Sequence, residues 1–287
     1  MDSKEVGLVA VQQLTGVEDL HYGFWDEDVK PEILEFKNAQ IRYTEFVLSA
    51  VKNEIEDPAN AKILEVGCGT GAMLAQLLSS GYRIDGVIPS EHLEKKVNEK
   101  VEKTVSDYKP RIFGCTFEAI LENHDVDKYD LIVFSESFQY VQIETNFSLL
   151  KTLLKEGGKV VICDFFKSVH HGDGGPGDSS FGGGHPIMTF YKLIEENNFM
   201  ILQDKDITKN MSLNLELIEE ILMERVLPTV QVLDKYTSLK YPTISKLVKF
   251  IYRKKLKKLK YKYIAGNRSR KTFERYKNYR LVVLGKS

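Results

Sequence analysis

The chain has 287 residues, of which 43% are hydrophobic and 28% are charged. This much apolar material can build a sizeable core, so the composition excludes a disordered or fibrous protein. A formal net charge of -1 argues against a protein that binds nucleic acid over its whole surface.

The first sixty residues are predicted to be helical and rich in aromatic residues. An aromatic cluster at 21–25 contains the only tryptophan, and helical spacing of apolar residues predicts a long amphipathic helix over 32–51. From residue 61 onward, strands and helices alternate. Strands are expected at 62–66, 83–88, 111–114, 130–134, 159–165, 200–204 and 279–284, and helices at 72–78, 92–103, 146–154 and 186–197. The alternation predicts an α/β fold with a doubly wound, mostly parallel seven-stranded sheet, which binds ligands at the carboxyl ends of its strands.

Two segments interrupt this alternation. Residues 170–185 form a glycine-rich loop at the ligand-binding edge, where a lid or binding loop is expected. Residues 213–263 are predicted to be mainly helical and precede the last strand. We therefore expect three parts: an N-terminal helical lid, an α/β core and an inserted, basic, helical substrate cap. Their ranges are 1–60 for the lid, 61–210 with 279–287 for the core, and 211–278 for the cap.

The cysteines and the N-terminus indicate a reducing compartment. Cys68, Cys115 and Cys163 are scattered and odd in number, which favours neither a disulfide framework nor a zinc site. The first residues contain no basic stretch followed by an apolar one, and no window has the roughly 18 consecutive apolar residues of a membrane span. We expect a cytoplasmic protein.

The sharpest motif is Glu-Val-Gly-Cys-Gly-Thr-Gly at 65–71, where the first predicted strand turns into a helix. Glycines there let a ligand approach the backbone, and the helix N-terminus offers N–H groups. Gly67, Gly69 and Ala72 also satisfy the looser dinucleotide pattern G-x-G-x-x-G/A. Glu65 favours a ligand with an amino-acid group over a dinucleotide, because a carboxylate attracts the ammonium of an amino acid and repels a pyrophosphate.

The motif resembles the first motif, E-x-G-x-G-x-G, of the class I S-adenosylmethionine-dependent methyltransferases. The resemblance extends roughly over 22–206 and is greatest to small-molecule methyltransferases of the tocopherol, sterol and sarcosine type. Three further blocks agree with that family, namely 21–25, Leu-Lys-Glu-Gly-Gly-Lys at 154–159, and 199–208.

The resemblance implies a Rossmann-like core with S-adenosylmethionine as the cofactor and S-adenosylhomocysteine as the product. The glycine motif would surround the methionine part, 116–117 would flank the adenine, and residue 135 would face the sulfonium end. The candidate cofactor-binding residues are Tyr22, Glu65, Gly67, Cys68, Gly69, Thr70, Gly71, Ser90, Thr116, Phe117 and Ser135.

One position departs from the family pattern. Members carry an acid at the tip of the second strand to bind the ribose hydroxyls, whereas this chain has Ile88. Asp85 is acidic but lies three residues earlier. Either Ser90 or Glu91 replaces the acid, or backbone groups hold the ribose.

Candidate catalytic residues are His170, His171 and His185, which bracket the glycine-rich loop, and Glu136 beyond the fourth strand. A base is needed only if the methyl acceptor loses a proton, and histidine suits that role near neutral pH. The same histidines are equally well read as exposed loop residues or a helix cap. The loop also contains Asp173 and Asp178, but the spacing of these ligand types matches no defined metal site, so we expect no metal.

The basic segment allows three interpretations. Residues 246–280 contain fifteen Lys and Arg and one acid, Glu274. A solvated cap helix is the plainest interpretation, a helix lying on a membrane surface is the second, and RNA contact is the third. No appended RNA-binding domain is recognisable, so no nucleic-acid partner is expected.

The sequence therefore predicts an enzyme that transfers a methyl group from S-adenosylmethionine to a small, partly hydrophobic O-, N- or C-nucleophile. Two alternatives stay open at this point: a cofactor-binding or regulatory protein without catalysis, and a nicotinamide-dependent oxidoreductase. We expect a small-molecule acceptor, a monomer or homodimer, and at most transient membrane contact through 246–280.

Overall fold

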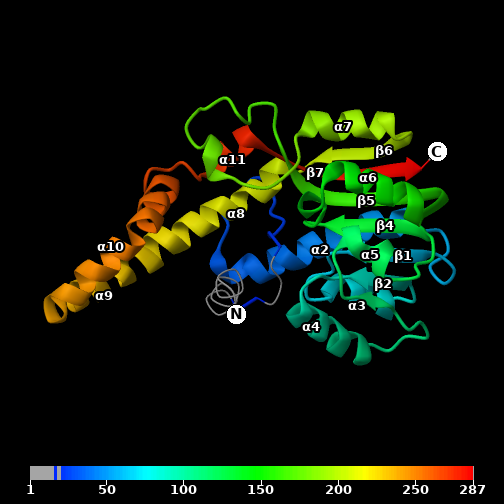
Figure 1. Ribbon diagram of the computed structural model, residues 1–287, viewed down its shortest axis with the longest axis horizontal. Coiled ribbons are helices and arrows are strands. Elements are labelled where there is room, and N and C mark those ends of the chain that lie inside the picture. The colour runs from blue at the N-terminus through cyan, green and yellow to red at the C-terminus, as the bar shows by residue number, and fades with distance from the viewer. Residues whose placement is uncertain (1–15, 18–20, 287) are drawn as a thin grey trace.

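The structure is a computed structural model that describes residues 16–17 and 21–286, except for the side chains of residues 244, 248, 255 and 256. Seven strands form one sheet in the order β3-β2-β1-β4-β5-β7-β6 (Figure 1). The neighbours from β3 to β5 pair in parallel, whereas β7 lies antiparallel between β5 and β6. The strands are β1 (Lys62–Val66), β2 (Arg83–Val87), β3 (Ile112–Phe113), β4 (Tyr129–Ser135), β5 (Leu154–Lys167), β6 (Phe199–Asp206) and β7 (Lys277–Lys286). The predicted doubly wound, mostly parallel sheet is confirmed.

Helices cover both faces of this sheet. One apolar core joins it to α2, α3, α4, α8 and α11, and a second joins it to α5, α6 and α7. The helices are α2 (Phe36–Asn53), α3 (Ala72–Ser79), α4 (Glu91–Glu102), α5 (Ile120–Asn123), α6 (Ile143–Leu153), α7 (Ile187–Glu196), α8 (Thr208–Glu220), α9 (Leu227–Lys240), α10 (Pro242–Leu259) and α11 (Arg270–Tyr276). Short 3-10 turns lie at Ile33–Glu35, Phe117–Ala119, Phe138–Tyr140 and Asp178–Ser180.

The apolar runs in the sequence follow from this two-sided burial. Successive side chains of a strand point to opposite faces, and in β4 Leu131 and Val133 enter the first core while Ile132 and Phe134 enter the second. All four are at most 1% exposed. A central parallel strand is therefore apolar along its whole length, without the alternation of a half-exposed strand.

The boundaries differ from the prediction where pairing decides them. β5 begins at Leu154, which pairs with Tyr129, and the register then shifts so that Lys159 pairs with Leu131. Residues 155–158 form a bulge at this point, so the Gly-Gly pair, which was expected before the strand, lies inside β5. β3 has only two residues, and α11 was not predicted.

Asp85 of β2 is a buried carboxylate at the centre of a polar cluster, here named the hub. It is fully buried, accepts hydrogen bonds from the hydroxyls of Tyr108 (2.7 Å) and Tyr129 (3.0 Å), and accepts another from the Arg111 backbone N–H (2.9 Å). The ammonium of Lys62 lies 3.3 Å from its second oxygen. Asp85 thus joins β1, β2 and β4 and has no access to the ligand-binding edge.

Asp85→Ala should lower the free energy of unfolding by about 3–5 kcal/mol, because it leaves two hydroxyls and the Arg111 backbone N–H without their acceptor and removes one of the two carboxylates beside the Lys62 ammonium. Asp127→Ala is the matched control: it pairs with the same lysine at 2.6 Å, but its side chain is 68% exposed. Such an exposed pair contributes about 0–1 kcal/mol. Urea unfolding of both variants measures the difference. Equal losses would show that Asp85 is not the hub.

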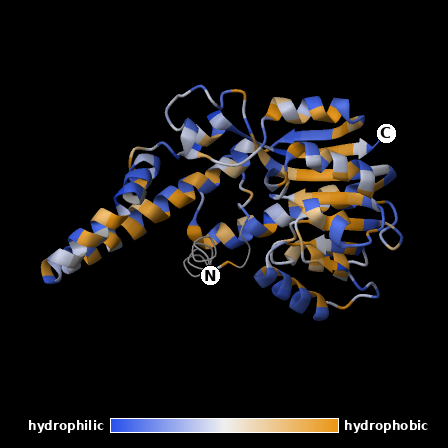
Figure 2. Cartoon of the chain, viewed as in Figure 1, coloured by the Kyte–Doolittle hydropathy of each residue, from blue (hydrophilic) through white to orange (hydrophobic). Residues whose placement is uncertain are grey.

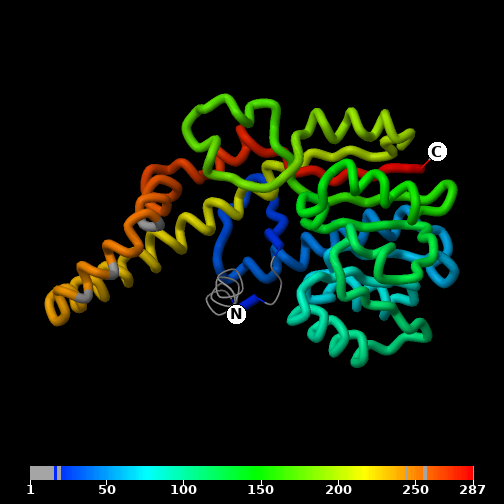
Figure 3. Tube along the Cα trace, in the orientation of Figure 1, coloured from blue at the N-terminus to red at the C-terminus, as the bar shows by residue number. Residues whose placement is uncertain are grey.

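The helical insertion lies between β6 and β7 and has two unlike parts. α8 and α11 pack on the core, whereas α9 and α10 run out from it and back (Figures 1 and 3). π-helical turns at Ile221–Val226 and Lys260–Ile264 join these parts. The helical content of 213–263 is confirmed; its role as a substrate cap stays a prediction. Residues 1–15 and 18–20 of the predicted lid lie outside the described residues.

Candidate active site

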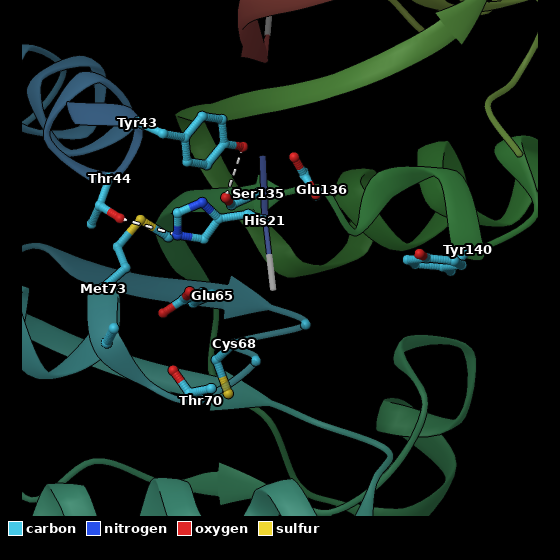
Figure 4. A pocket seen from close by; sticks show the side chains of 13 residues that line it. His21, Tyr43, Thr44, Glu65, Cys68, Thr70, Met73, Ser135, Glu136 and Tyr140 are labelled. Atoms are coloured by element: carbon cyan, nitrogen blue, oxygen red, sulfur yellow. Dashed lines mark hydrogen bonds between the residues drawn. The ribbon is translucent and has the colours of Figure 1, made fainter. Parts of the chain in front are cut away.

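A cavity of about 250 Å³ opens at the carboxyl ends of β1 and β4. Figure 4 shows its walls: the turn after β1 on one side, the end of β4 on another, and side chains of the N-terminal region across them. The lining residues are His21, Tyr43, Thr44, Glu65, Gly67, Cys68, Gly69, Thr70, Ala72, Met73, Ser135, Glu136 and Tyr140.

The glycine turn needs glycine for conformation and for space. Gly67, Gly69 and Gly71 have φ values of 75°, 54° and 75°, in the left-handed region that other residues rarely adopt. A Cβ on Gly67 would lie 2.6 Å from the Cβ of Ser137, so close packing excludes one there. A Cβ on Gly69 would meet no protein atom within 4 Å and would stand in open space.

This turn fits the amino-acid end of S-adenosylmethionine. The N–H groups of Gly67 and Cys68 donate to the Val87 carbonyl at 2.8 and 3.2 Å, which fixes the turn against the end of β2. Glu65 is 4% exposed and lines the cavity beside it. A carboxylate in a nearly closed site suits an ammonium ligand, and the bare backbone at Gly69 allows close approach. Glu65, Gly67 and Gly69 would therefore hold the methionine part.

Glu136 occupies the end of β4 in a strained backbone conformation. Its φ of 53° is one of two positive values for non-glycine residues among those described. The Tyr22 backbone N–H (3.0 Å) and the Tyr279 hydroxyl (2.7 Å) both donate to its Oε1. Burial raises the pKa of this carboxyl above its ordinary value. Left-handed residues of this kind gather at functional sites, because the surrounding structure must hold them there.

A chain of hydroxyl groups connects Glu136 to its neighbour Ser135 at the end of β4. The Tyr279 hydroxyl lies 3.2 Å from that of Tyr43, which lies 3.0 Å from Ser135 Oγ. Burial raises the pKa of both tyrosines well above the ordinary value, so both stay protonated as donors. β7 supplies Tyr279 and α2 supplies Tyr43, so segments distant in sequence meet at the end of β4.

His21 lies against this network on the wall of the cavity. Its ring stacks on Tyr43 with centroids 4.6 Å apart, and its Nε2 lies 3.3 Å from Thr44 Oγ1 (Figure 4). The Gln40 side chain donates to the His21 backbone carbonyl at 2.8 Å. The imidazole is therefore held by α2 in one orientation toward the pocket.

Seven of the predicted residues line the cavity together, and the others are not among the residues that line it. Those in the cavity are Glu65, Gly67, Cys68, Gly69, Thr70, Ser135 and Glu136. Gly71 precedes α3, Ser90 Oγ caps α4 by accepting from the Leu93 N–H at 3.4 Å, and Thr116 precedes a 3-10 turn. Phe117 is buried against Phe134. The cofactor roles of these outer residues stay predictions.

Tyr22 contributes its backbone to the site, through the hydrogen bond to Glu136, while its ring packs near Phe273 of α11. Ile88 is 4% exposed and lies in the core. The carboxylate of Asp85 is bonded within the buried hub described above. Neither position presents a carboxylate at the tip of β2. The manner in which the ribose is held stays a prediction.

The three loop histidines lie apart from the residues that line the cavity. His171 Nδ1 is 3.1 Å from Asp178 Oδ1 within the loop, and the His185 ring packs against Phe138 with Nε2 3.2 Å from its carbonyl. His170 is exposed beside them. Residues 16–17 and 21–286 include no group of three or more His, Cys, Asp or Glu placed to hold a metal ion.

Sequence reasoning assigned no catalytic or cofactor role to several residues of the site. These are His21, Tyr43, Thr44, Met73, Tyr140 and Tyr279. Of these, only His21 lies in the aromatic cluster at 21–25. No local pattern marks Tyr43 or Tyr279, because their partners lie 92 and 143 positions away.

Comparisons with known proteins agree with this geometry. Residues 37–203, more than half of the chain, match the family model described as a methyltransferase domain. An uncharacterized methyltransferase from Staphylococcus carnosus is 25% identical over 204 residues, which cover 68% of this chain and 88% of that protein.

Two solved structures share the fold. A putative sarcosine dimethylglycine methyltransferase from Galdieria sulphuraria superposes with a TM-score of 0.69 at 19% identity, over 97% of each chain. Geranyl diphosphate C-methyltransferase from Streptomyces coelicolor superposes with a TM-score of 0.66 at 18% identity, over 97% of this chain and 92% of that one. The family match, the sheet order and the glycine turn lead to one conclusion. The chain belongs to the methyltransferase-domain family and is a class I methyltransferase with S-adenosylmethionine as its cofactor.

Proposed function

We propose that this methyltransferase acts on a small, partly hydrophobic acceptor and that Glu136 takes the proton which the acceptor's oxygen or nitrogen loses. The cofactor, when bound, supplies an activated methyl group. The protein therefore has to place the nucleophile, exclude water and accept a proton. Tyr140 and Met73 provide apolar wall, and Glu136 provides the base.

The geometry of Glu136 carries the proposal. Both of its hydrogen bonds within the described residues end on Oε1, so Oε2 is the oxygen that an acceptor's proton can reach. The left-handed φ of this residue fixes the carboxylate at the end of β4, across the cavity from the glycine turn. A raised pKa brings a carboxylate closer to the range in which a general base works well.

The pH dependence of methyl transfer follows from the direction of this shift. Glu136 accepts a proton only when ionised, so kcat/KM should rise with pH through a pKa above the ordinary glutamate range and then level off. Binding of S-adenosylhomocysteine, measured by calorimetry over the same range, should change little. A profile that is flat across this range would remove Glu136 as the base.

An acceptor screen tests the substrate class. Protein and methyl-labelled S-adenosylmethionine are incubated with phenols, quinols and amines on one arm, and with alkenes that carry no O–H or N–H on the other. We expect label in products of the first arm only. Label in alkene products alone would contradict removal of an O–H or N–H proton by Glu136. It would leave the methyltransferase assignment intact.

A further inference from the structure

Residues 227–264, here named the basic hairpin, form the part of the molecule that extends away from the core (Figures 1 and 3). α8 places seven residues in the core, whereas none of the residues of α9 is buried. The two helices are held to each other at their outer end. Lys249 Nζ lies 2.7 Å from an oxygen of Asp234, and the hydroxyls of Ser238 and Ser245 are 2.9 Å apart.

The basic hairpin exposes large apolar side chains that a solvated helix pair would not carry. Leu239 is 77% exposed, Val232 69%, and Phe250 and Ile251 are each 63% exposed. The other exposed apolar residues of the hairpin are Val230, Leu233, Tyr236, Tyr241, Leu247, Tyr252, Leu259, Tyr261 and Ile264. An apolar surface of this extent marks an interaction site.

The charge of the same surface identifies its partner. Residues 227–264 contain eleven Lys and Arg and a single acid, Asp234, which Lys249 already pairs. Exposed lysines 254, 257 and 258 lie among the apolar residues of α10, and Figure 2 shows hydrophilic and hydrophobic residues interleaved along both helices. A second copy of the chain would bring two strongly positive hairpins together, which their charges oppose. A soluble polyanion would satisfy the lysines and leave the aliphatic residues in water.

We propose that the basic hairpin docks on the surface of a membrane that contains anionic lipids. Lysines of an interfacial helix contact the headgroups while leucines, phenylalanines and tyrosines enter the boundary of the acyl chains. The described helices are each too short or too polar to span a bilayer, so the contact is at the surface. Both requirements of such docking, positive charge and exposed apolar side chains, occur together here.

The segment just beyond the basic hairpin contacts the glycine-rich loop 170–185. Arg268, just beyond it, donates to the Ser180 carbonyl at 3.3 Å and lies over the ring of Phe181. Lys277 of β7 donates to the carbonyl of Gly183 in the same loop at 2.6 Å. Docking would therefore bring the loop 170–185 toward the bilayer. The docking proposal does not depend on the acceptor class proposed above.

Vesicle sedimentation tests this proposal with the full chain. Vesicles of phosphatidylcholine alone are compared with vesicles of equal parts phosphatidylcholine and phosphatidylglycerol. We expect sedimentation with the second kind only, weakening as salt rises. The triple variant Lys254→Glu, Lys257→Glu, Lys258→Glu should weaken binding at least about a hundredfold. The matched control makes the same change of charge in and beside α4, by Lys95→Glu, Lys96→Glu and Lys103→Glu. It should bind like the original chain.

A second pair of variants tests the apolar contribution. Phe250→Ser with Ile251→Ser leaves the charge unchanged and should weaken vesicle binding at least about tenfold. Leu34→Ser with Val105→Ser, which removes exposed apolar residues outside the hairpin, should have no effect. Since all substituted side chains are exposed, unfolding midpoints should stay the same. No sedimentation with anionic vesicles, or binding that the hairpin variants leave unchanged, would overturn the proposal. Binding to RNA without binding to vesicles would also overturn it.

Discussion

Gly69→Leu should weaken binding of S-adenosylmethionine and S-adenosylhomocysteine at least about a hundredfold, a loss of about 2.7 kcal/mol of binding free energy. Gly69 lines the cavity, and its missing side chain leaves open space where a Cβ would meet no protein atom within 4 Å. A leucine there occupies the space of the ligand and does not press on the protein. Calorimetric titration with S-adenosylhomocysteine measures the effect.

Gly81→Leu is the matched control for the backbone. Gly81 follows α3 with a φ of 85°, and a Cβ there also meets nothing within 4 Å. Both substitutions force leucine into the left-handed region, at a cost of about 1–2 kcal/mol of folding stability. Only Gly69→Leu should lose the ligand. Equal affinity in the two variants would mean that the ligand lies elsewhere.

Glu136→Gln should lower kcat/KM for methyl transfer by about 10²–10⁴-fold, the range of a general base, without weakening S-adenosylhomocysteine binding. Glutamine keeps the size of the side chain, and its carbonyl oxygen still accepts hydrogen bonds from Tyr279 and the Tyr22 N–H. It cannot take a proton from an acceptor. Initial rates with the best acceptor from the screen, measured over a pH series, give the result.

The readout that separates catalysis from structure is the pH profile. The rise of kcat/KM with pH should disappear in Glu136→Gln, whereas a merely structural change would lower the rate and keep the rise. Glu54→Gln makes the same change at the opposite end of the sheet, where Glu54 pairs with Lys159 at 2.9 Å. It should leave kcat/KM and the profile unaltered. A Glu136→Gln enzyme with normal rates would assign the base to another group.

Local patterns were sufficient to predict the central sheet. The apolar runs of β1, β2 and β4 reflect burial on both faces, and the glycines at 67–71 reflect the left-handed turn after β1. Each of these constraints acts within a few residues of sequence. The prediction therefore located one wall of the cavity, including Glu65 and Gly69, and the end of β4 at Glu136.

The opposite wall could not be predicted, because it depends on contacts between distant segments. Tyr279 reaches Glu136 only because β7 pairs between β5 and β6, and Tyr43 reaches Ser135 only because α2 packs on the face of the sheet over β4 and β5. His21 then follows from its stacking on Tyr43. Residue spacing contains no information about such pairings. The histidines of the glycine-rich loop attracted attention by composition alone, and the structure places them outside the cavity.

The extent of the helical insertion shows a similar limit. The spacing of its apolar residues predicted helices. That spacing is the same for a helix that packs on the core and for one that extends away from it. Burial separates α8, which packs on the core, from α9, which has no buried residue. The high density of lysine in α10 was the one sign in the sequence that this part stays at a surface.

A crystal structure of the chain with S-adenosylhomocysteine tests the central claim most directly. We expect its amino-acid end beside Glu65 and the backbone of Gly69, and its sulfur toward Ser135 and Glu136. An acceptor atom could then reach the methyl position and the Glu136 carboxylate from the same side. Ligand density in another cavity, or a sulfur directed away from Glu136, would contradict the site and the proposed base together.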